Sequence, residues 1–198
     1  MEREFKWTAT RADFDRIRAA YAGQCGEPHV IELDAVYYDT ADRALRAQRI
    51  GMRLRRENGA SVFCVKTGGR VVNGLHSHAE YEYPAETLAE GLAQLPGELA
   101  ALREGDYRPV CATHITRTAL LLTAPAFTAE LTYDTGELEG GGRRAPLSEI
   151  ECEQKSGDPA AFDAFGAALA EEMQLAPQPL SKLARALALE NNEFSSFS

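Results

Sequence analysis

Residues 147–155 read LSEIECEQK, and residues 1–7 read MEREFKW. In both stretches every second residue carries an ionisable side chain. Successive side chains of a β-strand point to opposite faces of a sheet, so each stretch predicts a strand with one charged face. In an ordinary half-buried antiparallel sheet the polar face is mixed in composition and meets water. A face made almost wholly of acids and bases therefore indicates a different kind of sheet.

The same charged alternation recurs in residues 51–56, 78–83 and 127–134. If these strands close into a barrel with helices outside, the charges point into the lumen. The residues placed on this face are Glu2, Glu4, Lys6, Arg53, Arg55, His78, Glu80, Glu82, Glu130, Asp134, Glu149, Glu151 and Glu153. Carboxylates bind hard divalent cations, and arginine and lysine bind phosphate oxygens. Such a lumen suits a polyanion that is held through divalent cations.

The remaining pattern predicts an α+β fold in one unit. Helices are predicted after a Thr10 cap, over residues 86–103 with a break at Pro96, over residues 159–173 and after a Ser181 cap. Asn58 and Gly59 predict a tight hairpin turn. The glycine-rich stretches 68–74 and 136–144 are predicted to be loops. No fixed repeat or heptad pattern is present, which excludes solenoids and coiled coils.

Composition narrows the class of protein. A chain of 198 residues corresponds to about one domain, and a net charge of −9 disfavours a whole-surface partnership with nucleic acid or an anionic membrane. Four cysteines lie without metal-ligand spacing and are expected to be buried free thiols. Neither a membrane-spanning apolar run nor a signal peptide is apparent, so the expected location is the cytoplasm.

Several stretches, in order, are similar to those of the CYTH superfamily, the triphosphate tunnel metalloenzymes. The opening Glu2-x-Glu4-x-Lys6 resembles the family's ExExK signature, and residues 37–58 resemble its YxDTxxxxLxxxxxxLRxRRE stretch. Residues 147–158, LSEIECEQKSGD, resemble its second acidic strand, and residues 181–189, SKLARALAL, its final SKxxRxxxL segment. The sequences of residues 74–84 and 148–158 most resemble those of bacterial inorganic triphosphatases.

This resemblance implies a closed, antiparallel, eight-stranded β-barrel, or tunnel, that acts on triphosphate-containing substrates with Mg²⁺ or Mn²⁺. It implies metal ligands at Glu2, Glu4, Asp134, Glu149, Glu151 and Glu153, and phosphate-binding residues at Arg53, Arg55, Lys66, Arg117, Lys182 and Arg185. Glu2, Glu4 and Lys6 are expected to be catalytic, with Lys6 orienting the attacking water. One departure is His78, which stands where the family usually has arginine. His78, Glu80, Glu82 and Glu130 are expected to be luminal, without an assigned role.

Three functions remain open at this point. The leading one is metal-dependent hydrolysis of inorganic triphosphate, and the same scaffold suits an adenylyl cyclase or a nucleoside or thiamine triphosphatase. A non-catalytic barrel that binds polyphosphate is the third. The expected organisation is a single CYTH-like domain over residues 1–190, a frayed tail over residues 191–198, and a monomer or homodimer without nucleic-acid or membrane partners.

Overall fold

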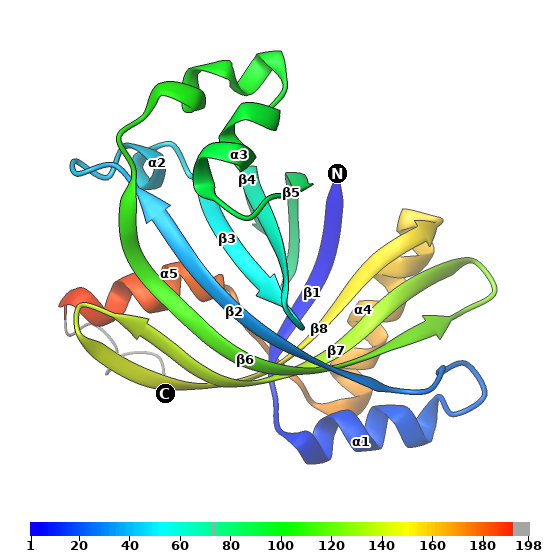
Figure 1. Ribbon diagram of the computed structural model, residues 1–198. Coiled ribbons are helices and arrows are strands. Elements are labelled where there is room, and N and C mark those ends of the chain that lie inside the picture. The colour runs from blue at the N-terminus through cyan, green and yellow to red at the C-terminus, as the bar shows by residue number, and fades with distance from the viewer. Residues whose placement is uncertain (73, 192–198) are drawn as a thin grey trace.

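Eight antiparallel strands form a closed barrel in the computed structural model, which describes residues 1–72 and 74–191 (Figure 1). The strands are β1 (Glu2–Thr8), β2 (His29–Asp39), β3 (Gly51–Glu57), β4 (Ala60–Val72), β5 (Leu75–Pro84), β6 (Arg108–Thr123), β7 (Phe127–Gly140) and β8 (Arg143–Gly157). They follow the order β5-β4-β3-β2-β6-β7-β8-β1, and pairing of β1 with β5 closes the ring. The predicted eight-stranded α+β barrel is thereby confirmed. A short additional strand, β9 (Ala176–Pro177), pairs with the end of β1.

In the sequence, the helices lie between barrel strands or follow the last of them. They are α1 (Arg11–Ala20), α2 (Ala44–Ala47), α3 (Leu88–Gln94), α4 (Pro159–Met173) and α5 (Lys182–Ala188), with 3-10 turns η1 (Gly97–Glu104) and η2 (Leu189–Asn191). The predicted caps are present, because Thr10 and Ser181 each accept a hydrogen bond from a first-turn backbone N–H. No helix within the described residues is long and apolar enough to cross a membrane.

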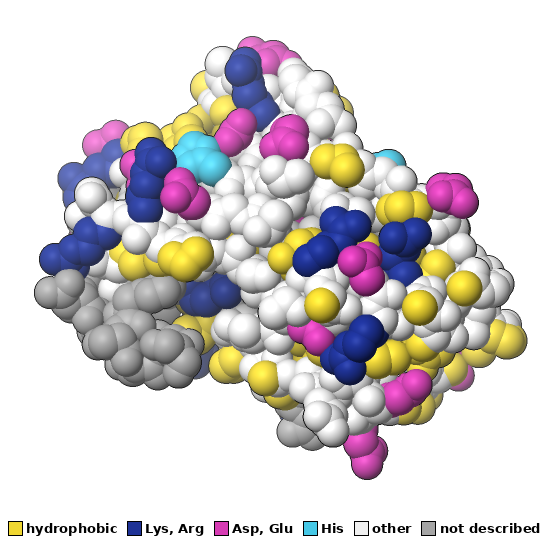
Figure 2. Space-filling view, turned by 90° about the horizontal axis from the view of Figure 1, so that it is seen from below, with side chains coloured by type: hydrophobic (Ala, Val, Ile, Leu, Met, Phe, Trp, Pro, Cys, Tyr) yellow, Lys and Arg dark blue, Asp and Glu magenta, His cyan; other side chains and the backbone are white. Residues whose placement is uncertain are grey.

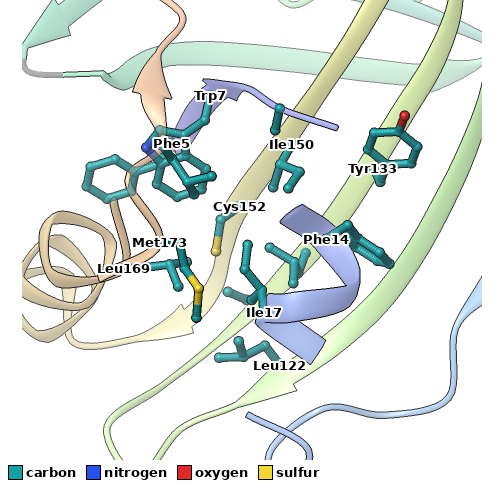
Figure 3. Close-up of a cluster of buried hydrophobic side chains, with 14 of the residues drawn as sticks. Phe5, Trp7, Phe14, Ile17, Leu122, Tyr133, Ile150, Cys152, Leu169 and Met173 are labelled. Carbon is teal, nitrogen blue, oxygen red and sulfur yellow. The ribbon is translucent and has the colours of Figure 1, made fainter. Parts of the chain in front are cut away.

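The largest hydrophobic core lies outside the barrel wall. Alternate side chains of β1, β6, β7 and β8 point away from the lumen and pack beneath α1 and α4 (Figure 3). Phe5 and Trp7 stack with ring centroids 5.5 Å apart, and Phe14 and Ile17 of α1 are fully buried in the same cluster. The apolar half of each alternating strand is thus covered by helices, which leaves the charged half facing inward.

Helix α5 differs from the helices outside the barrel. Leu183 and Leu187 line the barrel's internal cavity, and Leu187 packs with Leu33 and Ala35, which line the cavity from β2. The barrel is therefore filled from inside along part of its length by an amphipathic helix. The charged residues at the start of α5 are carried into the interior by this packing.

Two predicted loops are wrong. Gly136 to Gly140 belong to β7, and only Gly141 and Gly142 make the turn into β8. A Cβ at position 136 would lie 2.0 Å from the His114 carbonyl oxygen, so this glycine permits close strand approach rather than a loop. Strand β4 likewise continues past Gly68 and Gly69 through a register shift. The predicted Asn58-Gly59 turn is confirmed, since both residues have positive φ.

The outer surface shown in Figure 2, which views the molecule from below, carries acidic and basic side chains interspersed with scattered hydrophobic ones. All four cysteines are free, and three of them are buried, as expected. The predicted frayed tail lies outside the described residues except for Asn191.

Candidate active site in the barrel lumen

The barrel encloses a cavity of about 760 Å³. Side chains from all eight barrel strands, and from α5, line it. The predicted site residues in its wall are Glu2, Glu4, Lys6, Arg53, Arg55, Lys66, His78, Glu80, Glu82, Arg117, Glu130, Glu151, Glu153 and Lys182. Asp134, Glu149 and Arg185 are not part of this wall; they are buried next to it. Strand alternation thus brings together most residues that the sequence placed on the charged face.

Three carboxylates converge at the inner end of α5. Ligand oxygens of Asp134, Glu149 and Glu151 lie within 4.8 Å of one another, and the Lys182 ammonium sits among them. Lys182 Nζ is 2.8 Å from Asp134 Oδ2 and 2.8 Å from Glu151 Oε1, and it also pairs with Glu149. We call these four residues the deep cluster. Its cation position is filled by the protein's own ammonium group.

Three further basic groups surround the deep cluster. Arg117 binds Asp134 through two hydrogen bonds of 2.8 Å and binds Glu151 at 2.7 Å. Lys6 donates to Glu151, and Arg185 donates to Glu149. Each of the three buried acids therefore has at least two basic partners, which is the arrangement that lets charged groups stay ionised away from water.

The pKa values in this region follow from that pairing. Burial opposes ionisation of Glu151, but the charges of Lys182, Lys6 and Arg117 outweigh it and hold its pKa well below the ordinary range. Burial likewise opposes the charge of Lys6, yet Glu151 and Glu4 raise its pKa well above the ordinary value. Lys6 therefore stays protonated and is a hydrogen-bond donor rather than a base.

A second group of charges lies where β1 meets β5. Lys66 Nζ is 2.9 Å from Glu2 Oε2 and 3.2 Å from Glu80 Oε1. His78 Nε2 is 2.5 Å from Glu2 Oε2. We call Glu2, Lys66, His78 and Glu80 the outer cluster, because its lysine is 27% exposed whereas that of the deep cluster is 10% exposed. Cys64 donates to Glu80 at 3.0 Å, a contact that no sequence motif indicated.

Arg53 and Arg55 make a basic pair with spare hydrogen-bonding capacity. The Nε atoms of both are buried and have no hydrogen-bond partner among the described residues. Burial lowers the pKa of Arg55, and the nearby charges of Arg53 and Arg117 lower it further. Glu82 Oε1 lies 3.3 Å from Arg55 and 3.6 Å from Arg53. Arg53 also lies 3.6 Å from Glu80, and Arg55 pairs with Glu57. The two guanidinium groups are thus partly neutralised by acids, but their Nε donors stay available to an additional acceptor.

Glu2, Glu4 and Glu153 form a carboxylate-rich position between β1 and β8, where Glu4 is the register partner of Glu153. Burial raises the pKa of Glu153, and the charges of Glu2 and Glu4 act in the same direction against the lowering effect of Lys155. Each of the three acids has one lysine partner, which is Lys66 for Glu2, Lys6 for Glu4 and Lys155 for Glu153. An all-carboxylate donor set of this kind fits a hard divalent cation such as Mg²⁺ or Mn²⁺.

The sequence analysis missed several residues of the cavity wall. Arg46, Arg49 and Arg70 add positive charge at exposed positions of the lining. They lie outside the regular alternation that marked the other residues, so no periodic signal could have identified them. Lys155 also lies in the wall and pairs with Glu153 at 2.7 Å. Arg56 is exposed.

Comparison with known proteins agrees with this architecture. The inorganic triphosphatase of Haemophilus influenzae is 33% identical to this chain over 165 residues, which make up 82% of this chain and 47% of that protein. The chain thus spans about half the length of this curated relative.

Two solved structures share the fold. A Hippeastrum protein, described as a candidate adenylyl cyclase with a dominant triphosphatase activity, superposes with a TM-score of 0.67 at 17% identity, covering 99% of this chain and 96% of its own. The PH1819 protein of Pyrococcus horikoshii superposes with a TM-score of 0.62 at 20% identity, covering 93% of this chain and 97% of its own. A model of the CYTH domain matches residues 1–187, and this chain therefore belongs to the CYTH domain family.

Proposed function

We propose that this chain hydrolyses inorganic triphosphate, or a closely related triphosphate compound, with the help of Mg²⁺ or Mn²⁺. The observation that carries the proposal is the pair Arg53 and Arg55, whose buried Nε donors lack partners among the described residues and whose side chains line the cavity. A triphosphate supplies the acceptors that these donors lack. The related Haemophilus influenzae protein, an inorganic triphosphatase, supports the same substrate.

The proposed roles divide the lumen. Glu2, Glu4 and Glu153 would hold the divalent cation, which neutralises phosphate charge when bound. Arg53, Arg55 and Lys66 bind the non-bridging phosphate oxygens, since the two arginines line the cavity with unpartnered Nε donors and Lys66 is more exposed than Lys6, Arg117 and Lys182.

Lys6 and the deep cluster have roles other than holding the metal ion. Lys6 is held protonated by Glu4 and Glu151, so it donates a hydrogen bond to the attacking water or to a phosphate oxygen and does not remove a proton. Asp134, Glu149 and Arg185, which the sequence placed among metal and phosphate ligands, anchor α5 through ion pairs. Lys182 and Arg117 reach the cavity but are bound to these acids.

Phosphate release from inorganic triphosphate, ATP, thiamine triphosphate and pyrophosphate, each with EDTA, Mg²⁺ or Mn²⁺, tests the proposal. We expect metal-dependent release that is fastest from inorganic triphosphate. Arg55→Gln is expected to lose most of this activity, whereas Arg56→Gln, the exposed neighbour on the same strand, retains it. Faster release from a nucleoside or thiamine triphosphate, or cyclic AMP formation from ATP, would reassign the substrate. No phosphate release from any of these compounds would favour a non-catalytic barrel that binds polyphosphate.

A further inference from the structure

The closing seam of the barrel brings an imidazole next to two carboxylates. In the β1–β5 pairing Glu2 lies directly opposite His78, and Glu80 follows two residues later on the same face. One ligand atom from each of Glu2, His78 and Glu80 lies within 4.8 Å of the other two. This group lies where β1 pairs with β5. Glu4 and Glu153 instead face each other where β1 pairs with β8, along the other edge of the strand.

The inward-facing ring nitrogen of His78 makes no hydrogen bond to any described residue. Its side chain is only 10% exposed, and its Nε2 atom is buried with no hydrogen-bond partner among the described residues. Glu2 Oε2 is the atom it faces, at 2.5 Å, but the two do not meet in hydrogen-bond geometry. A buried polar atom normally makes a hydrogen bond, so a ring nitrogen that contacts a carboxylate oxygen without one indicates that the two atoms can bind the same ion.

We propose that Glu2, His78 and Glu80 form a second cation site, selective for borderline divalent ions of the Zn²⁺ and Co²⁺ class. Imidazole nitrogen favours such ions over Mg²⁺, which prefers oxygen ligands alone. The site shares Glu2 with the carboxylate position on the β8 side, so the two ions compete for that residue. The inference does not depend on triphosphate hydrolysis, because metal binding alone can establish or refute it.

Neighbouring groups bear on this site from two strands. Lys66 of β4 bridges Glu2 and Glu80, and Arg53 of β3 lies 3.6 Å from Glu80 Oε1. The Lys66 ammonium lies between the two acids and shows that this position stabilises a positive charge. Because the lysine side chain is long and partly exposed, it can move into the lumen when a metal ion binds in its place. Cys64 donates to Glu80 Oε1 and so orients this ligand in the manner of an outer-sphere hydrogen bond.

Calorimetric titration of the purified chain with Zn²⁺ in excess Mg²⁺ and without substrate is the test, with Co²⁺ absorption as an independent reading of nitrogen ligation. We expect one Zn²⁺ site that survives Mg²⁺. His78→Gln is expected to weaken it at least about tenfold, since even the loss of outer-sphere partners costs that much. His114→Gln is the matched control, because His114 is exposed and pairs with Asp34 elsewhere on the barrel.

Lys66→Gln keeps the test decisive if His78→Gln does not fold. Removing the ammonium that competes for Glu2 and Glu80 is expected to tighten Zn²⁺ binding and to leave the nitrogen signature in the Co²⁺ spectrum. Unchanged Zn²⁺ affinity in both variants, or a Co²⁺ spectrum that His78→Gln leaves as it is, would overturn the assignment. Loss of binding in His114→Gln would move the site to the surface and overturn it as well.

Discussion

The deep and outer clusters are built from the same residue types but differ in how completely their charges are satisfied. In the deep cluster Lys182 contacts three carboxylates, and Arg117 and Arg185 supply further donors. In the outer cluster the partly exposed Lys66 pairs with both acids, and His78 Nε2 contacts Glu2 without making a hydrogen bond. Dense ion pairing in a buried position indicates a structural role, even though Glu149 Oε1 and Arg185 Nε make no hydrogen bond there within the described part of the chain. Incomplete pairing indicates where a ligand binds.

The largest expected effect is on folding and comes from the deep cluster. Asp134→Asn removes a fully buried charge that both Arg117 and Lys182 contact, and it leaves those cations uncompensated. Breaking one side of a buried ion pair costs about 3–5 kcal/mol. Urea unfolding should show this loss in the free energy of unfolding. A loss below 1 kcal/mol, on the order of a surface change, would mean that the deep cluster does not support the fold.

Arg185→Gln should have the next largest effect. Arg185 is buried on α5 and donates to Glu149, so the substitution weakens the anchor of the helix without removing Lys182. A hydrogen bond to a charged group contributes about 1.5–3 kcal/mol. The midpoint of thermal unfolding should fall accordingly, and hydrogen exchange in α5 should quicken more than exchange in β1.

Much of this architecture was predictable from sequence, and the reasons are physical. Strand alternation has a period of two, so the inward position of Glu2, Arg53 and Glu151 followed once the charged face was identified. Predicted boundaries were less accurate at glycines, because Gly136 serves close strand packing rather than a turn. The residues around a glycine do not indicate which backbone atoms of the neighbouring strand lie next to it.

Which charges are most deeply buried could not be read from the sequence. Asp134 and Glu2 both lie on charged strand faces, yet Asp134 is fully buried with Arg117 and Lys182, whereas Glu2 pairs with the partly exposed Lys66. This distinction depends on α5 entering the barrel, which its apolar contacts with β2 and β6 determine. Those contacts join parts of the chain that are far apart in sequence.

Acid should destabilise the protein through the deep cluster. Burial opposes the charge of Asp134, but Arg117 and Lys182 outweigh it and lower its pKa, as happens for Glu151. A carboxyl with a lowered folded pKa stabilises the fold above its unfolded pKa of about 4, and that contribution is lost as pH falls towards the folded value.

The slope is at most about 1.4 kcal/mol per pH unit for each proton. Urea unfolding at a series of pH values below about 5 should therefore show a steeper decline for the wild-type chain than for Asp134→Asn, which lacks one of these carboxyls. Parallel curves would place the acid sensitivity outside the deep cluster.

The smallest expected change in stability belongs to the open side of the lumen. Glu82 is 40% exposed and lies 3.3 Å from Arg55, so Glu82→Gln should alter the free energy of unfolding by no more than about 0.5 kcal/mol. The same change removes one of the two acids paired with Arg55 and leaves Glu57, so binding of inorganic triphosphate should strengthen. Weaker binding in this variant would show that Glu82 helps to hold the ligand instead of competing with it.

Metal-free calorimetric titration of inorganic triphosphate into Arg55→Gln and Arg185→Gln, with the thermal stability of each measured in parallel, tests the division of roles most directly. The two variants make the same chemical change at Arg55, which lines the cavity, and at Arg185, which lies outside the cavity wall and anchors α5. We predict that Arg55→Gln loses affinity and keeps its unfolding midpoint, whereas Arg185→Gln keeps affinity and unfolds at lower temperature. The opposite result, with Arg185→Gln losing affinity at unchanged stability, would contradict the account.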